Sequence, residues 1–222
     1  MLYKKYDQIE ICHGSKDIVE RPVYGKGEIN NDYGRGFYSV SIKNEELAKE
    51  WACSPFNSTG VGFVNRYSLD TRDLNVLDFE KRDIIYWIVL TATCREPNLK
   101  GNELSILQKE YLIDTALFDC IYGWRCDDTY SRIIARFMDD ACTDKAIWEA
   151  TRLGHLNRQF VIVSEKAFDH LKYNDSYKVN DFSRYRNRFL SRKNEADDGF
   201  NACVRKNRSN GKYLTDYLEE LK

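Results

Sequence analysis

Proline, excess charge and long apolar runs are all scarce in this chain of 222 residues. Three prolines are too few for long extended linkers between separate folded units. Lys and Arg total 34 against 35 Asp and Glu, so the chain lacks the overall positive charge that attracts nucleic acid. No apolar run reaches the length that spans a bilayer without including a charge. We expect a globular protein without a membrane partner, in which any basic surface is local.

The cysteines and histidines lack the spacing of a disulfide framework or a metal site. Seven cysteines are present, an odd number, and no two form a CxxC pair. Most lie in apolar runs, which indicates buried free thiols in a reducing compartment. None of the three histidines has metal-ligand spacing to another His or Cys, so no metal site is predicted. The first residues lack the apolar stretch of a signal peptide, and we expect a cytoplasmic location.

Strand-like and helix-like segments alternate irregularly along the chain. The strand-like segments are 8–13, 36–41, 62–69, 74–79, 118–124 and 159–164, and the helix-like segments are 44–52, 111–117, 131–138, 145–153 and 166–171. The run 83–94 reads either as a helix or as a helix that continues into a strand. Regular strand–helix–strand alternation is missing, which favours an α+β fold over a doubly wound sheet.

The sequence also predicts where one helix begins, where another ends and where the domain ends. Asn44 is expected to cap the helix 44–52, in which Trp51 belongs to an apolar stripe. Gly154 is expected to end the helix 145–153. The segment 184–193 carries five positive charges, which marks a change of composition after residue 180. We expect one domain over residues 1–180 and a basic helical C-terminal appendage over residues 181–222.

Two short segments near the start combine glycine with hydrogen-bonding side chains. The first is Cys12-His13-Gly14-Ser15, and the second is Gly34-Arg35-Gly36-Phe37-Tyr38. Glycine removes the steric limits that a Cβ imposes, so backbone in both segments is expected to be open to a flat ligand. His13 offers one hydrogen bond at a fixed position, and Tyr38 offers a ring whose stacking contributes about 0.5–1.5 kcal/mol beyond area burial. The phosphate-binding pattern GxGxxG is absent.

These segments, followed by the helix Glu45–Ala52, resemble the first two NAD-binding motifs of the ADP-ribosyltransferase superfamily, in its poly(ADP-ribose) polymerase and diphtheria-toxin-like branch. The later segments Phe118–Tyr130 and Leu153–Val161 resemble those of a poorly characterised bacterial family of that superfamily. The resemblance extends over residues 8–175. It implies an α+β fold with an ADP-ribosyltransferase-like split mixed β-sheet core and flanking helices.

The resemblance also implies a role for each matching residue, with NAD as the substrate. His13 would hydrogen-bond the nicotinamide ribose, Gly14 would hold the carboxamide through its backbone, and Tyr38 would stack on the nicotinamide. The remaining members of the expected NAD-binding set are Ser15, Gly36 and Arg125. The reaction breaks a glycosidic carbon–nitrogen bond through an oxocarbenium-like species, which a nearby carboxylate stabilises.

The chain departs from the superfamily at the residue expected to supply that carboxylate. Gln159 occupies the place where the superfamily usually has a glutamate at the start of a strand. A glutamine can hydrogen-bond the ribose 2′-hydroxyl, but it has no charge and cannot act as a base. Chain elongation is therefore not expected, whereas single transfer and loss of activity are both compatible with Gln159. Restoring the carboxylate with Gln159→Glu is expected to raise NAD hydrolysis if the positions correspond.

Asp127 and Asp128 are further candidates for catalysis. They follow the predicted strand 118–124 and precede the helix 131–138. Acidic residues complement the dipole at a helix N-terminus, which is a structural interpretation. The functional interpretation is that one of them replaces the missing glutamate or orders the site together with Arg125. The sequence leaves both interpretations open.

The resulting hypothesis is an NAD-dependent mono-ADP-ribosyltransferase that modifies a macromolecular target as a bacterial toxin or effector. A protein acceptor is favoured over nucleic acid, and an inhibitory partner protein is compatible with this class. One alternative is a catalytically degenerate module that binds NAD or ADP-ribose. Another is a nucleic-acid-directed ADP-ribosyl- or phosphotransferase, because aromatics are interleaved with the basic residues of 184–193. For that segment we favour an amphipathic helix that docks on the domain.

Overall fold

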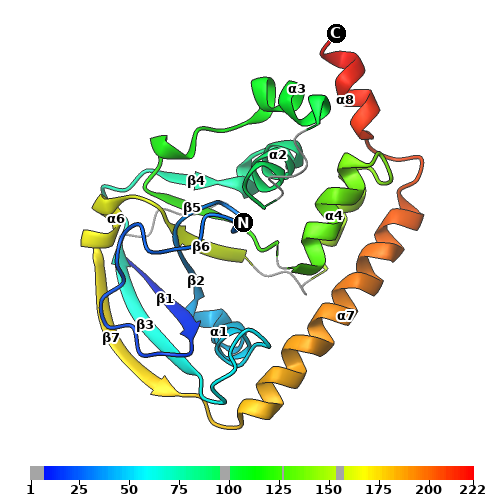
Figure 1. The fold of residues 1–222 in the computed structure, drawn as a ribbon. Coiled ribbons are helices and arrows are strands. Elements are labelled where there is room, and N and C mark those ends of the chain that lie inside the picture. The colour runs from blue at the N-terminus through cyan, green and yellow to red at the C-terminus, as the bar shows by residue number, and fades with distance from the viewer. Residues whose placement is uncertain (1–7, 96–100, 127, 154–157) are drawn as a thin grey trace.

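A computed structural model describes residues 8–95, 101–126, 128–153 and 158–222 of the chain, without the side chains of 128–131 (Figure 1). The strands are β1 Gln8–Ser15, β2 Phe37–Ser41, β3 Phe63–Asp70, β4 Val76–Asp78, β5 Cys120–Trp124, β6 Arg158–Ile162 and β7 Leu171–Lys178. The α-helices are α1 Glu45–Ala52, α2 Ile84–Arg95, α3 Asn102–Tyr111, α4 Asp128–Met138, α5 Asp144–Ala150, α6 Glu165–Asp169, α7 Phe182–Lys206 and α8 Leu214–Glu220.

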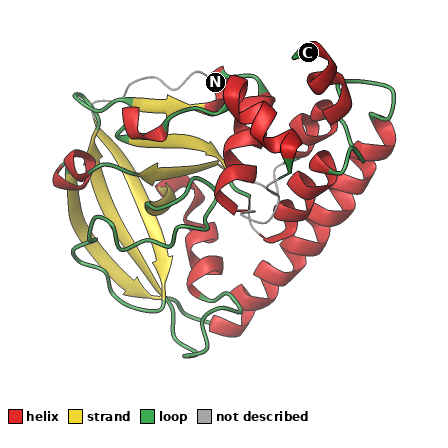
Figure 2. Cartoon of the chain, turned by 45° about the horizontal axis from the view of Figure 1, so that its top comes forward, coloured by secondary structure: helices red, strands yellow, loops and turns green. Residues whose placement is uncertain are grey.

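The strands form one mixed sheet in the order β4-β5-β6-β2-β1-β3-β7. The pair β4–β5 is parallel, and the other neighbouring strands pair antiparallel. Helices flank the sheet, and in Figure 2 most of them gather on the side away from β3 and β7. The predicted α+β class, with a mixed sheet and flanking helices, is therefore confirmed.

The sheet is held together weakly at its centre. Strand β1 pairs with β3 along its whole length, but it pairs with β2 only at Ile11↔Ser41 and Cys12↔Val40. The other half of β2, residues 37–39, pairs with β6 instead. Strands β1 and β2 therefore separate after Cys12, and the sheet consists of two halves that join at two residue pairs.

Side-chain alternation along β1 supplies apolar residues to both faces of the sheet. Cys12 packs with Leu47 of α1 on one face, whereas Ile11 packs with Tyr67 in a separate cluster on the other. The largest cluster surrounds α2, which is buried nearly all round because its sequence is apolar on every side. This packing fixes α1 against β1 and thereby sets one wall of the candidate site.

The C-terminal helices share this core with the rest of the chain. Phe200 and Val204 of α7 and Tyr217 of α8 belong to the same cluster as α2. Nearer its start, α7 lies along α1, where the Arg192 guanidinium donates two hydrogen bonds of 2.7 Å to the buried Glu50 carboxylate. These contacts support the docking interpretation of the segment 184–193.

Most predicted elements are present, and four local predictions are wrong. Asn44 stands at the N-cap of α1, but its side chain makes no capping hydrogen bond. Helix α3 ends at Tyr111, and the segment 111–117 contains only a 3₁₀ turn, Thr115–Leu117. Helix α5 ends at Ala150 with Thr151 as C-cap, so Gly154, which lies outside the described residues, does not end it. The open alternative at 83–94 is settled in favour of a helix, α2.

The fourth error is a missed strand, β7, whose first residue was assigned to the helix 166–171. Helix α6 ends at Asp169, and β7 begins at Leu171. Strand β7 is at the edge of the sheet and is half exposed, so its sequence LKYNDSYK has no regular apolar alternation. Pairing with β3 creates this strand, because the local sequence contains no strong strand signal.

The described residues also bear on the cysteines and on membrane insertion. All seven cysteines are free, six of them buried and Cys94 partly so, as expected from their apolar surroundings. Burial raises the pKa of the Cys12 thiol to about 12 and that of Cys53 to about 11. Among the helices in the described ranges, none combines the length and apolarity needed to cross a bilayer.

Candidate functional site

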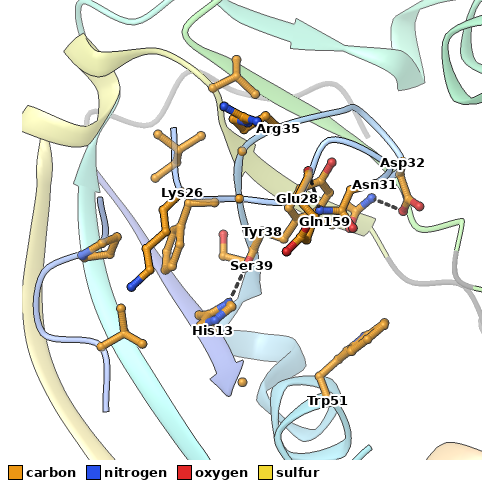
Figure 3. A pocket seen from close by; sticks show the side chains of 18 of the residues that line it. His13, Lys26, Glu28, Asn31, Asp32, Arg35, Tyr38, Ser39, Trp51 and Gln159 are labelled. Atoms are coloured by element: carbon orange, nitrogen blue, oxygen red, sulfur yellow. Dashed lines mark hydrogen bonds between the residues drawn. The ribbon is translucent and has the colours of Figure 1, made fainter. Parts of the chain in front are cut away.

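A cavity of about 940 Å³ lies where β1 and β2 separate. The loop 16–36, helix α1 and the start of β6 contribute to its walls, as Figure 3 shows for the labelled side chains. Six residues predicted for the site line this cavity: His13, Gly14, Gly36, Tyr38, Arg125 and Gln159. The fold thus brings together residues that are up to 146 positions apart in the sequence, from His13 to Gln159.

His13 is held by a hydrogen bond across the gap between the strands. Its Nδ1 lies 2.7 Å from the main-chain carbonyl oxygen of Tyr38, which can only accept, so Nδ1 carries the proton and donates. The ring packs on Phe37, with centroids 4.7 Å apart. Burial lowers the pKa of His13 below its ordinary 6.5, more than the bond to Tyr38 raises it. A neutral imidazole in this tautomer has Nε2 left as a hydrogen-bond acceptor.

Tyr38 is fixed by the turn that precedes its strand. The phenol donates to the carbonyl oxygen of Gly34 over 2.7 Å and accepts from the backbone N–H of Tyr33 over 3.0 Å. Burial raises the pKa of this phenol well above 10, so it stays protonated and keeps donating. The ring is therefore a rigid apolar surface in the cavity wall, suited to contact with a flat ligand.

The two predicted glycines are required by close packing. A Cβ on Gly14 would lie 1.8 Å from the carbonyl oxygen of Ala48 in α1. A Cβ on Gly36 would lie 2.6 Å from Cγ1 of Val161 in β6. Other protein atoms thus occupy the Cβ side of both glycines, and the expectation that their backbone is open to a ligand stays a prediction. Both residues still line the cavity with their remaining atoms.

Gln159 is buried, and its amide nitrogen is fully engaged. Nε2 donates to Oδ2 of Asp32 over 2.6 Å and to the carbonyl oxygen of Trp124 over 3.3 Å. The contact with Asp32 is the dashed line at the right of Figure 3. An amide nitrogen has two hydrogens, and these two acceptors use both. A carboxylate therefore lies in contact with the side chain of Gln159.

Asp32 is the residue that sequence reasoning missed. Its side chain is only 8 % exposed, and its carboxylate also accepts from the backbone N–H of Cys126 and forms an ion pair with Arg95. It lies two residues before Gly34, and its partners come from α2, from the segment that follows β5 and from β6. A carboxylate next to a glycine-rich turn is a weak local signal, which is why it was overlooked.

Trp51 and Arg125 form a further part of the wall. The Arg125 guanidinium lies over the Trp51 ring, 5.2 Å from its centroid, and is nearly buried. Trp51 also packs edge-on against Phe189 of α7. The sequence pattern assigned Trp51 to the apolar stripe of α1, whereas the structure places it at the cavity.

The loop 16–36 is tied down at its beginning. The buried Asn65 side chain accepts from the N–H of Val19 over 2.8 Å and donates to the Ser15 hydroxyl over 3.0 Å. Ser15 in turn donates to the carbonyl oxygen of Asp17. Ser15 therefore organises the loop and, unlike its neighbours His13 and Gly14, does not line the cavity. Further along, Lys26, Glu28, Asn31 and Arg35 bring charge and polarity to the cavity.

The remaining predicted site residues are Asp127 and Asp128. Asp127 lies outside the described residues, and Asp128 is described only as the first residue of α4. The catalytic role predicted for this pair therefore stays a prediction. Within the described part of the chain, no group of three His, Cys, Asp or Glu residues is arranged to hold a metal ion.

Comparison with known proteins identifies a family. The family described as "Protein of unknown function (DUF3990)" matches residues 9–173, and the chain belongs to it. The matched range includes the whole set His13, Tyr38, Arg125 and Gln159, together with Asp32. No curated protein matches the chain significantly. No solved structure matches it significantly either.

Proposed function

We propose that this DUF3990 protein is an NAD-dependent mono-ADP-ribosyltransferase with an ADP-ribosyltransferase-like split sheet, acting on a protein acceptor. The observation that carries the proposal is the single cavity lined by His13, Tyr38 and Gln159. The sequence resemblance assigns His13 and Tyr38 to NAD binding and Gln159 to catalysis. The weak join between β1 and β2 supports the same fold assignment. The proposal includes a toxin- or effector-like role in the cytoplasm and control by an inhibitory partner protein.

The cavity suits the nicotinamide half of NAD chemically. Its volume of about 940 Å³ lies in the range of small-molecule sites. In the proposed complex, the nicotinamide packs on the Tyr38 ring, and a ribose hydroxyl donates to Nε2 of His13. Gly14 contributes backbone to the carboxamide. Trp51 and Arg125 close the wall near α1.

The proposed reaction transfers ADP-ribose with balanced bonds. The bond between ribose C1′ and the nicotinamide nitrogen breaks, and its electron pair leaves with neutral nicotinamide. A nucleophilic atom of the acceptor forms the new bond to C1′, and its proton passes to solvent water. Gln159 is neutral, so the carboxylate in direct contact with it is that of Asp32, whose charge Arg95 partly compensates. This weaker field favours single transfer to a strong nucleophile over chain elongation.

Two measurements test the proposal. Calorimetry with NAD should show binding at one site, and labelled NAD incubated with protein and bacterial or eukaryotic lysate should release nicotinamide and label a protein band. The control variant His170→Ala should behave like the wild type in both measurements. His170, like His13, bonds a backbone carbonyl, but it lies outside the cavity. Absence of NAD binding at millimolar concentration would contradict the proposal.

A degenerate NAD- or ADP-ribose-binding module is the second candidate. The observation that favours it is the neutral Gln159 amide, whose nitrogen is committed to Asp32 and Trp124. Binding of NAD without nicotinamide release or label transfer would select this candidate. The nucleic-acid-directed alternative has less support, because Arg188 and Arg192 of the basic segment are paired with Glu46 and Glu50.

A further inference from the structure

We infer that Asp32 is a positioning residue: it fixes the Gln159 amide with its carbonyl oxygen toward the cavity, so that the site selects ligand hydroxyl groups. The inference deepens the proposed function and rests on it only for the identity of the ligand as NAD. Its structural part, the locked amide, is independent of any ligand.

The orientation of the amide follows from the chemistry of its two partners. Oδ2 of Asp32 and the carbonyl oxygen of Trp124 both face the same end of the Gln159 side chain, at 2.6 Å and 3.3 Å. A carboxylate oxygen and a main-chain carbonyl oxygen only accept hydrogen bonds. Turning the amide over would place Oε1 against two oxygens that only accept, so both contacts would become repulsive. The –NH₂ group must therefore face Asp32, which leaves Oε1 for the cavity.

Asp32 can perform this role because it is itself held in place. Oδ2 accepts from the Cys126 N–H over 2.7 Å, and Arg95 forms an ion pair with Oδ1. These donors come from the start of the α4 connection and from the end of α2, two parts of the core that are well packed. A buried carboxylate with such partners has one preferred rotamer, so the amide that bonds to it has one preferred direction.

The consequence is a cavity wall with two acceptors on opposite sides. Nε2 of His13 accepts because Nδ1 donates to Tyr38, and Oε1 of Gln159 accepts because Nε2 donates to Asp32. No protein donor in the described ranges bonds to this Oε1. Two acceptors require ligand groups that donate, and a ribose with free hydroxyls supplies two such donors. A ligand with an acceptor-only substituent leaves one of these atoms unpaired, which costs affinity.

The first arm of the test needs no ligand. In ¹⁵N-labelled protein, the Gln159 side-chain amide signals are those missing from Gln159→Met, and their exchange with water is measured by NMR. We expect slow exchange in the wild type and at least tenfold faster exchange in Asp32→Asn. Fast exchange in the wild type, or unchanged exchange in Asp32→Asn, would overturn the inference whether or not NAD binds.

The second arm measures selectivity with NAD and two analogues in which fluorine replaces either the 2′- or the 3′-hydroxyl of the nicotinamide ribose. The wild type should bind at least one analogue about tenfold more weakly than NAD. For that analogue, the ratio of dissociation constants should fall to near one in Asp32→Asn, in Gln159→Met and in the double variant alike. A purely structural role for Asp32 predicts weaker binding of all three ligands with an unchanged ratio, and that result would overturn the inference. Failure to bind NAD would instead refute the proposed function and leave the first arm to decide.

Discussion

The Nδ1 atom of His13 donates a hydrogen bond to the carbonyl oxygen of Tyr38 over 2.7 Å. This bond joins β1 and β2 immediately after their backbone pairing has ended at Cys12. It therefore does two things at once: it ties the two halves of the sheet together, and it sets the imidazole tautomer that faces the cavity. Both consequences lead to measurable expectations.

Replacing His13 with alanine should weaken NAD binding about tenfold. The substitution removes the Nε2 acceptor, and a typical lost hydrogen bond of about 1 kcal/mol together with lost ring packing accounts for this change. The measurement is calorimetric titration with NAD. His170→Ala is the matched control, since its Nδ1 also donates to a backbone carbonyl, that of Asp70, over 3.2 Å. If both substitutions weaken NAD binding equally, His13→Ala acts by disturbing the fold and not by removing a group that contacts NAD.

The pH dependence of binding should reflect the lowered pKa of His13. Because burial lowers that pKa below 6.5, Nε2 is mostly unprotonated at pH 7 and above, and NAD affinity should change little between pH 7 and pH 8. At lower pH, affinity should fall as Nε2 takes up a proton. The unfolded chain binds this proton more readily than the folded one, so the free energy of unfolding should also decrease as pH falls below 6.5. Both decreases should be smaller in His13→Ala.

Replacing Gln159 with glutamate should destabilise the protein and should not raise NAD hydrolysis. In the wild type, Oδ2 of Asp32 lies 2.6 Å from the Gln159 amide nitrogen. In Gln159→Glu, a carboxylate oxygen would take the place of that nitrogen and would face Asp32. Two carboxylates in contact repel each other, and we expect a loss of about 2 kcal/mol at pH 7. The new group binds its proton more tightly in the folded state, so stability should be regained as pH falls. Urea unfolding at pH 5 and pH 7, with Gln159→Met and Asp32→Asn/Gln159→Glu as controls, measures this.

The contact with Asp32 thus reverses the expectation drawn from sequence for the same substitution. A Gln159→Glu variant that is as stable as the wild type and hydrolyses NAD faster would show that the two side chains are not in contact.

Adding a methyl group to Gly14 should damage the packing of α1 on β1. The new Cβ would lie 1.8 Å from the Ala48 carbonyl oxygen, a backbone atom that moves only with the helix. We expect Gly14→Ala to cost about 3 kcal/mol of unfolding free energy. Gly60→Ala is the control: it meets no atom within 4 Å, but its φ of +74° strains an alanine by about 1 kcal/mol. Chemical unfolding of both variants checks the difference.

Removing the Arg192 guanidinium should loosen the contact between α7 and α1. Glu50 is 1 % exposed, and Arg192 holds both of its oxygens at 2.7 Å. Arg188 remains nearby at 3.4 Å, so we expect Arg192→Ala to cost about 3 kcal/mol, the lower end for breaking a buried pair. Arg184→Ala, at an exposed position of the same helix, should change stability by less than about 0.5 kcal/mol. Thermal unfolding of the two variants separates docking from general charge effects.

Several predictions from sequence were accurate because they rest on local physics. Strand alternation and helical apolar stripes identified β1, β2, β3, β5, β6, α1 and α5 within a few residues. The glycines at 14 and 36, which the sequence singles out, are required by close packing on their Cβ sides. Strand β7 was missed because an exposed edge strand needs little apolar alternation, and its pairing partner β3 supplies most of its stability.

The candidate site was only partly visible in the sequence. The residues His13, Tyr38 and Gln159, which the sequence singles out, line one cavity, and their roles there stay predictions. Asp32 was missed because its contact with Gln159 joins residues 127 positions apart, and no local pattern marks such a partner. Trp51 was assigned to the core for a related reason: an aromatic on the apolar side of a helix looks the same whether it faces a core or a cavity.

The amino-acid sequence therefore determined most of the secondary structure, the free buried thiols and the identity of the imidazole, phenol and amide in the cavity, since each depends on neighbouring residues. The tertiary structure alone decided how these groups are used. The bond to Tyr38 makes His13 an acceptor, and the bond to Asp32 makes Gln159 an acceptor as well. A hydrogen-bonding side chain has more than one orientation, and only its partners in the folded chain select one.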